Sequence, residues 1–264
     1  MNAPESKLHT CASSIPLASS LGVRPGITAV IGAGGKTTLL RLLAKELTTP
    51  CDGMSRPSNV ILCTSTHILP FPEYPSVETP PGTASEDCDC SVSGRIHKAL
   101  EVSPVVCVGT PETSLKDGAV KYTAPSVPFE QLAEIADYVL VEADGSRHHS
   151  FKAHAAHEPV IPEGSGLVIY VAGASGFMKP VRDAVHRPEL FCTQMNRLLS
   201  PESRITPDSL LTPELAAVHI GREDLADICC LFSGYDMGMY ESIPKTADLI
   251  SRFRDALSLP LVVI

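Results

Sequence analysis

The apolar residues of this chain gather in short unbroken runs, and between the runs apolar residues recur every third or fourth position. An unbroken run of about four to eight residues is typical of a strand buried on both faces, whereas the wider spacing is typical of a helix. The runs predict strands at residues 27–31, 59–64, 105–108, 138–141, 167–171, 228–232 and 261–264. The spaced segments predict helices at residues 39–47, 96–102, 129–136, 188–199, 213–218 and 245–257. Buried strands that alternate with helices indicate a three-layer α/β/α fold with a mostly parallel sheet.

The domain organisation follows from the length and from the prolines. We expect an N-terminal extension at residues 1–25 and a single α/β domain at 26–264, a common size for such a domain. A proline-rich insertion near 70–90 is expected to lack regular structure. Residues 116–124 predict a turn or small hairpin around an Asp-Gly pair.

A glycine-rich turn joins the first predicted strand to the first predicted helix. Glycines let successive backbone N–H groups face a phosphate, a lysine adds a positive charge, and a threonine hydroxyl can reach Mg²⁺. The usual motif has a further glycine where this chain has Val30, so the turn is short and resembles that of the Mur ligases. We interpret it as a P-loop-like site for Mg²⁺ and ATP or GTP. Its residues are Gly32, Ala33, Gly34, Gly35, Lys36, Thr37 and Thr38.

A second candidate motif follows the strand predicted at 138–141. Glu142 and Asp144 precede Gly145, which matches the carboxylate-x-x-glycine spacing in GTPases, where the acid holds the magnesium shell and the glycine meets the γ-phosphate. Glu142 is the first candidate for the metal shell, but Asp144 could take that role or orient the attacking water. A solvated Asp-Gly turn at the end of a strand is the structural alternative.

The nucleotide base has a weaker candidate contact. GTPases end a later strand in Asn-Lys-x-Asp, whose aspartate pairs with guanine. At the corresponding place, after the strand predicted at 228–232, only Asp236 matches. The sequence therefore leaves the choice between ATP and GTP open.

Charge and cysteine content narrow the class of protein. A formal net charge of −9 argues against sequence-independent nucleic-acid binding, which needs clustered lysine and arginine. No apolar stretch approaches the roughly 20 residues that span a bilayer, so no membrane association is expected. Nine cysteines, several inside apolar runs, favour a reducing, cytoplasmic location. Cys88 and Cys90 form a weak candidate for a soft-metal pair in an acidic loop.

Several segments of the chain match one known family when taken together: the glycine turn and the segments 64–66, 141–147, 151–153, 157–162 and 186–190. Together these segments resemble the YqeC family of selenium-dependent hydroxylase accessory proteins. The resemblance extends over most of residues 26–264 and implies a P-loop nucleotide-binding fold linked to maturation of molybdenum hydroxylases. Three features depart from the family pattern: His67, where the family tends to have lysine, Ser233-Gly234, where it has an Asn-containing motif, and the proline-rich segment 70–90.

Four of the segments that carry the resemblance predict a surface for a second substrate, namely 141–147, 151–153, 157–162 and 186–190. Arginine and lysine suit an anionic group, such as the phosphate of a pterin, beside the γ-phosphate. The histidines and a glutamate leave open a zinc or molybdenum site, and singly the histidines fit ordinary surface or core positions. The candidates are Arg147, Lys152, His157, Glu158, His186 and Arg187.

The leading functional hypothesis is a Mg²⁺-dependent NTPase that assists maturation of a molybdenum hydroxylase or of its molybdopterin-type cofactor. Lys36, Glu142 and Asp144 would act in catalysis, through positioning and charge neutralisation. Two alternatives stay open. One is a nucleotide-responsive binding protein that does not hydrolyse, and the other is a Mur-ligase-like or kinase-like enzyme that activates an acceptor by phosphoryl transfer.

Overall fold

The computed structural model describes residues 15–49, 57–81, 91–113, 118–146, 148–198, 204–233 and 243–264. The helices are α1 (Leu17–Ser20), α2 (Lys36–Leu47), α3 (Val92–Val102), α4 (Phe129–Ile135), the 3-10 turn η1 (Ala174–Gly176), α5 (Val181–Ala184), α6 (Pro188–Asn196), α7 (Pro213–Glu223) and α8 (Ile243–Ala256). The strands are β1 (Gly26–Gly32), β2 (Val60–Thr64), β3 (Ser76–Glu78), β4 (Val105–Thr113), β5 (Val120–Thr123), β6 (Tyr138–Glu142), β7 (Phe151–Lys152), β8 (Leu167–Gly173), β9 (Val185–His186), β10 (Ile228–Phe232) and β11 (Leu261–Val263).

One large sheet organises the molecule. Its strand order is β11-β10-β8-β1-β6-β2-β4-β3, every neighbouring pair is parallel, and β5 adds to β4 in antiparallel fashion. β1 lies between β6 and β8, and Val30 of β1 is in register with Glu142 of β6. The register brings the turn after β1 and the acids at the end of β6 to the same edge of the sheet, where parallel α/β sheets bind ligands.

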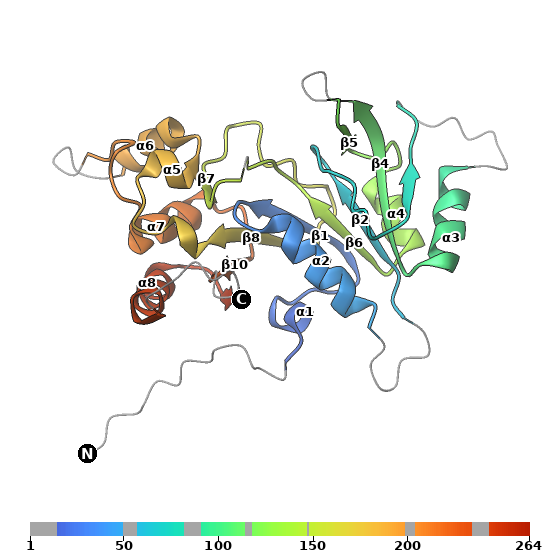
Figure 1. Cartoon of the computed structure of the whole chain (residues 1–264), viewed down its shortest axis with the longest axis horizontal. Coiled ribbons are helices and arrows are strands. Elements are labelled where there is room, and N and C mark those ends of the chain that lie inside the picture. The colour runs from blue at the N-terminus through green and yellow to red at the C-terminus, as the bar shows by residue number, and fades with distance from the viewer. Residues whose placement is uncertain are drawn as a thin grey trace, which may run out of the picture.

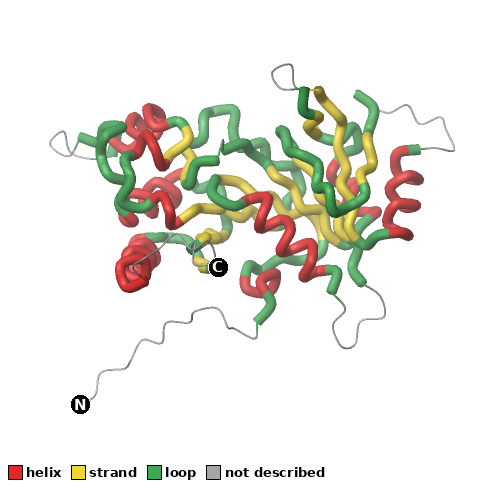
Figure 2. Tube along the Cα trace, in the orientation of Figure 1, coloured by secondary structure: helices red, strands yellow, loops and turns green. Residues whose placement is uncertain are grey.

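Helices cover both faces of this sheet. On β1, Val30 faces a core that includes α1 and α2, while Ala29 and Ile31 face the opposite core, which includes α5 to α8. At the other end of that second face, α3 and α4 pack on β2, β4 and β6. Figure 1 shows α2 crossing one face of the sheet, and Figure 2 shows helices flanking the central strands. The three-layer α/β/α prediction is confirmed.

The predicted strands all occur, and several elements are longer than expected. The predicted hairpin is confirmed by the antiparallel pairing of β4 with β5. The helix predicted at 213–218 continues to Glu223. Gly221, which would interrupt an isolated helix, lies where an added Cβ would be 2.4 Å from the Ser258 hydroxyl, so its small size permits this close packing.

The expectation of no regular structure across 70–90 is wrong at Ser76–Glu78. These residues form β3, an edge strand parallel to β4. Pro75 and Pro80 lie outside the strand, so neither removes one of its backbone donors. Val77, in the middle, is buried against the α3 side of the core. Residues 82–90, including Cys88 and Cys90, lie outside the described residues.

Residues that the sequence assigns to an N-terminal extension contact the α/β core. The backbone N–H groups of Leu17 and Ala18 donate hydrogen bonds of 2.8 and 2.7 Å to the carboxylate of Glu46, in the last turn of α2. Ala18 and Leu21 are buried in the core beneath α2. The described part of the extension therefore covers part of the sheet.

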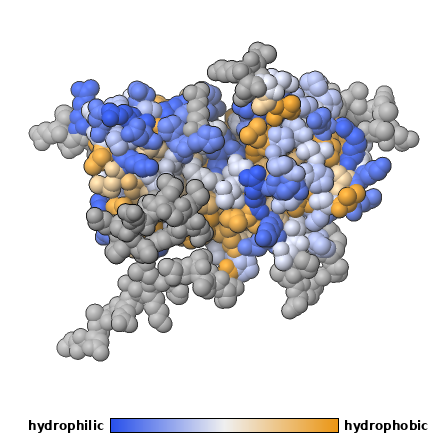
Figure 3. Space-filling model, in the orientation of Figure 1, coloured by the Kyte–Doolittle hydropathy of each residue, from blue (hydrophilic) through white to orange (hydrophobic). Residues whose placement is uncertain are grey.

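The described helices offer no candidate for a membrane span, because none of them combines sufficient length with sufficient apolar character. On the face shown in Figure 3, hydrophobic residues appear as separate patches among hydrophilic ones.

Candidate functional site

The glycine turn has a backbone that side chains would obstruct. Gly32, Gly34 and Gly35 have φ angles of +89°, +78° and +136°, which residues with a Cβ rarely adopt. A Cβ on Gly32 would lie 2.4 Å from the carbonyl oxygen of Val171, and one on Gly35 would lie 2.7 Å from the Phe232 ring. The turn is held this tightly because β8 and β10 pack directly against it.

The turn leads into the N-terminus of α2, with Gly35 as the N-cap. Lys36, the first residue of α2, is buried, and its Nζ donates a 2.9 Å hydrogen bond back to the carbonyl oxygen of Gly32. The Thr37 hydroxyl donates to Glu142 Oε2 at 3.1 Å. Because unpaired backbone N–H groups and the helix dipole converge here, this N-terminus favours an anion.

Asp144 lies at the centre of the site. Its side chain is fully buried. Oδ2 accepts a 2.9 Å hydrogen bond from the Gly32 amide, and Oδ1 lies 3.1 Å from the Nζ of Lys36. Lys152 Nζ and His154 Nε2 approach Oδ2 at 3.4 and 2.7 Å. The carboxylate thus joins the glycine turn to a second group of charged residues.

The two acids at the end of β6, Glu142 and Asp144, have pKa values that are shifted in opposite directions. Burial raises the pKa of Glu142, and the nearby Lys36 and the Thr37 hydrogen bond only partly offset that effect. Burial alone would also raise the pKa of Asp144, but the hydrogen bond from His154 and the charges of Lys36 and Lys152 hold it below its ordinary value. Asp144 is therefore the firmly ionised member of the pair.

A chain of charges runs from Asp144 towards the surface. Lys152, on β7, is fully buried, and its Nζ donates to the Gly145 carbonyl at 2.7 Å and lies 3.1 Å from Glu158 Oε2. The same oxygen of Glu158 accepts from Arg187, the N-cap residue of α6. Burial opposes ionisation of Glu158, but Arg187 and Lys152 lower its pKa to about 2.

A second branch runs from Asp144 into α7. His154 bridges two carboxylates, because its Nδ1 lies 2.8 Å from Glu223 Oε2 while its Nε2 contacts Asp144. Burial alone would lower the pKa of His154, but both carboxylates raise it. His219 Nε2 and the Tyr170 hydroxyl contact the Lys152 carbonyl at 3.2 and 2.9 Å. Burial lowers the pKa of His219.

Most of the sequence candidates meet in this one network. The residues that it joins are Gly32, Lys36, Thr37, Glu142, Asp144, Gly145, Lys152, Glu158 and Arg187. His186 lies beside it on β9, where its ring stacks on His149 with centroids 5.9 Å apart. Thr38 and His157 are exposed, and no hydrogen bond or ion pair joins either side chain to another described residue. Arg147 and Asp236 lie outside the described residues.

Sequence reasoning missed Glu223 and His219 and gave His154 no separate role. His154 and His219 are buried, the Glu223 side chain is 8% exposed, and Glu223 is 69 residues away from His154 in the chain. One signal was present, because His219 and Glu223 are four residues apart and share a helix face. Because the helix was predicted to end at residue 218, His219 and Glu223 were not recognised as neighbours on one helix face.

The part of the chain that the structure describes contains no group of three or more His, Cys, Asp or Glu side chains that could hold a metal ion. The zinc or molybdenum alternative for the histidine-rich segment gains no support there. Thr37 and Glu142 offer two oxygen ligands of the kind that Mg²⁺ takes together with phosphate oxygens and water.

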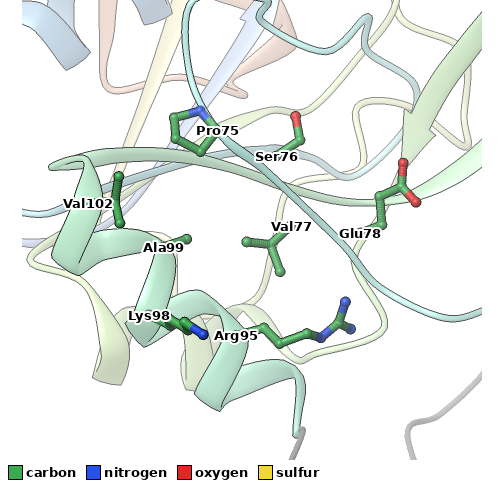
Figure 4. A pocket seen from close by; sticks show the side chains of 8 residues that line it. All are labelled: Pro75, Ser76, Val77, Glu78, Arg95, Lys98, Ala99 and Val102. Carbon is green, nitrogen blue, oxygen red and sulfur yellow. The ribbon is translucent and has the colours of Figure 1, made fainter.

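A groove of about 530 Å³ lies at the sheet edge between β3 and α3, far from the glycine turn. Figure 4 shows Arg95 and Lys98 of α3 on one side and Glu78 of β3 on the other. The strands β4, β2 and β6 separate it from β1, so it has no part in the charge network. Its lining residues are Pro75, Ser76, Val77, Glu78, Arg95, Lys98, Ala99 and Val102.

A comparison with protein families matches residues 28–189 to the family described as YqeC protein. The chain belongs to the YqeC family. The "Uncharacterized protein YqeC" of Escherichia coli (strain K12) is 28% identical over 226 residues, which cover 84% of this chain and 73% of that protein. No solved structure gives a significant match. The YqeC match includes the glycine turn, both acids and Arg187, but it ends before α7, which supplies Glu223.

Proposed function

We propose that the protein binds a nucleoside triphosphate with Mg²⁺ at the glycine turn and hydrolyses it. The observation that carries this proposal is the meeting of four features at one sheet edge. They are a tight glycine turn, a helix N-terminus, a lysine, and a threonine hydroxyl 3.1 Å from a carboxylate. Each suits a different part of a magnesium triphosphate.

In the proposed complex the roles divide by chemistry. The N–H groups of the turn and Lys36 would neutralise the phosphates, while Thr37 and Glu142 would hold Mg²⁺, which supplies charge neutralisation at the transferred phosphate. Lys36 now contacts Asp144, yet Asp144 Oδ1 has no hydrogen-bond partner among the described residues. The contact is therefore ionic and poorly aligned, and a phosphate chain can compete for the lysine.

Asp144 fits a supporting role better than a ligand role. Its side chain is fully buried, accepts a hydrogen bond from the Gly32 amide and contacts the side chains of Lys152 and His154. A metal ligand would have to give up these contacts. We assign Asp144 the task of fixing the glycine turn through the Gly32 amide, and we assign the metal shell to Glu142 and Thr37.

The test compares two lysines on the same helix. Lys36→Ala removes the proposed phosphate contact, and Lys45→Ala removes an exposed lysine at the far end of α2. Mg²⁺-ATP or Mg²⁺-GTP should raise the melting temperature of the wild type and of Lys45→Ala but not that of Lys36→Ala. If neither nucleotide protects the wild type, the binding proposal is wrong.

Hydrolysis is measured separately as phosphate release by the same proteins. Nucleotide protection without turnover would favour a nucleotide-responsive binding protein instead of an NTPase.

We further propose that this activity assists maturation of a molybdenum hydroxylase or its molybdopterin-type cofactor in the cytoplasm. The ground for this role is the resemblance of the sequence motifs to the YqeC family, since the family match itself concerns membership alone. We expect nucleotide turnover to rise when a molybdopterin-type cofactor or the apo-hydroxylase is added. A turnover rate that neither addition changes would contradict the accessory role and leave nucleotide binding intact.

A further inference from the structure

One oxygen atom of Glu158 is held between two cations. Glu158 Oε2 lies 3.1 Å from Lys152 Nζ and also accepts from Arg187 Nη1. The Lys152 side chain has no exposed surface, whereas those of Glu158 and Arg187 are 15% and 29% exposed. The position therefore has a buried positive charge beneath it and an arginine at an opening to solvent.

This arrangement has the chemistry of a site for an oxyanion. A buried lysine is costly unless an anion stays beside it, and a guanidinium binds carboxylate or phosphate oxygens with directional hydrogen bonds. Lys152 retains Asp144 at 3.4 Å and the Gly145 carbonyl at 2.7 Å when Glu158 is absent. It would thus stay in position to receive another oxyanion.

The Glu158 side chain can leave without disturbing the sheet. Glu158 lies between β7 and β8, outside any helix or strand. Its backbone N–H is held locally by the Ala155 carbonyl at 2.9 Å, and Val160 anchors the same segment to the Ala143 carbonyl at 3.0 Å. Rotation of the side chain breaks neither of these hydrogen bonds.

We propose that Lys152 and Arg187 form a second anion subsite, which the Glu158 carboxylate fills in the free protein and which a carboxylate or phosphate of a second ligand fills in its place. A single carboxylate, Asp144, separates Lys152 from Lys36. The anionic end of the second ligand would therefore lie beside the nucleotide phosphates. That neighbouring relation rests on the proposed function, whereas the subsite itself rests only on the contacts of Glu158.

The experiment uses inorganic phosphate as the probe, titrated by calorimetry into protein whose glycine turn is saturated with Mg²⁺ and a non-hydrolysable ATP analogue. Glu158→Gln removes the competing charge and should tighten phosphate binding roughly tenfold or more. Adding Arg187→Gln to that variant should abolish the gain.

The matched control is Glu214→Gln. Glu214 forms a two-bond pair with Arg252 on the surface, so this variant also removes the hydrogen-bonded partner of an arginine, which keeps only Asp248 at 3.9 Å and has no buried lysine beside it. It should bind phosphate no better than the wild type. Equal phosphate affinity in Glu158→Gln and Glu214→Gln would overturn the subsite.

Two further arms keep the outcomes separable. If the wild type does not bind nucleotide, phosphate is titrated without nucleotide into Lys36→Ala and into Lys36→Ala/Glu158→Gln. Tighter phosphate binding by the double variant alone supports the subsite, although the nucleotide proposal has failed. If Glu158→Gln does not fold, Arg187→Gln alone is compared with the wild type. In this comparison the glycine turn is saturated with the nucleotide analogue or, if nucleotide does not bind, carries Lys36→Ala. Loss of thermal protection by millimolar phosphate then supports the subsite, and unchanged protection overturns it.

Discussion

Replacing Asp144 with alanine should destabilise the protein strongly, because Asp144 compensates buried positive charge. The substitution leaves Lys36, Lys152 and His154 without their shared carboxylate and removes the acceptor of the Gly32 amide. Removing one partner of a buried ion pair costs about 3–5 kcal/mol, and an orphaned buried donor costs about 1–3 kcal/mol. These costs overlap, since Glu142, Glu158 and Glu223 still neutralise part of the charge, so we expect about 4 kcal/mol.

Urea unfolding followed by circular dichroism measures this loss. With a slope of about 3 kcal/mol per molar urea for a chain of this length, the midpoint should fall by roughly 1.3 M. Asp144→Asn keeps an oxygen that can accept from the Gly32 amide, so its urea midpoint should fall less. Asp208→Ala breaks a comparable pair with Arg182 on the surface, where both side chains are more than half exposed, and should change the midpoint little. If Asp144→Ala unfolds within about 0.3 M of the Asp208→Ala midpoint, the network does not stabilise the fold as argued.

Three other substitutions test separate contacts. Gly32→Ala should lower the free energy of unfolding by at least about 3 kcal/mol, because the added methyl group clashes with a β8 carbonyl and the alanine backbone is strained at positive φ. Gly22→Ala is also at positive φ but in open space, so it should lower the free energy of unfolding by only about 1 kcal/mol. Equal urea midpoints for the two variants would contradict the clash. Tyr170→Phe removes the hydroxyl that donates to the Lys152 carbonyl at 2.9 Å, so the free energy of unfolding should fall by about 1 kcal/mol in the same assay. An unchanged urea midpoint would rule out a net contribution from this hydrogen bond. The pKa of Glu158 falls from about 4.3 in the unfolded chain to about 2 in the folded protein, so its stabilisation is present above pH 4.3 and is lost as the pH falls towards 2. Between pH 5 and pH 3 the wild type should therefore lose more stability than Glu158→Gln in acid titrations of urea-induced unfolding, and parallel profiles would refute the ion pairs assigned to Glu158.

The order of strands and helices could be predicted because its signal is local. Apolar runs such as 138–141 and 228–232 are buried on both faces, so their hydrophobicity alone marks them. β3 escaped prediction because three residues between prolines carry no such run, and the strand exists only because β4 offers it a ladder.

The candidate site divides in the same way. The glycine turn and the two acids at the end of β6 could be picked out as candidates from the sequence, because the turn needs glycine at positive φ and the acids stand where a buried strand ends. The different contacts of the two acids could not be predicted from the sequence. Glu142 accepts from Thr37, whereas Asp144 points into a buried cluster of cations, and both arrangements depend on residues far away in the chain.

The sequence by itself thus determined most of the segments that form the sheet and where the glycine turn of the candidate site lies. Only the tertiary structure decided that Glu223 of α7 supports His154, that His154 supports Asp144, and that Lys152 is shared between Asp144 and Glu158. These charges come from segments far apart in the chain. They can remain buried only where the fold brings opposite charges within hydrogen-bonding distance, and no local pattern records that proximity.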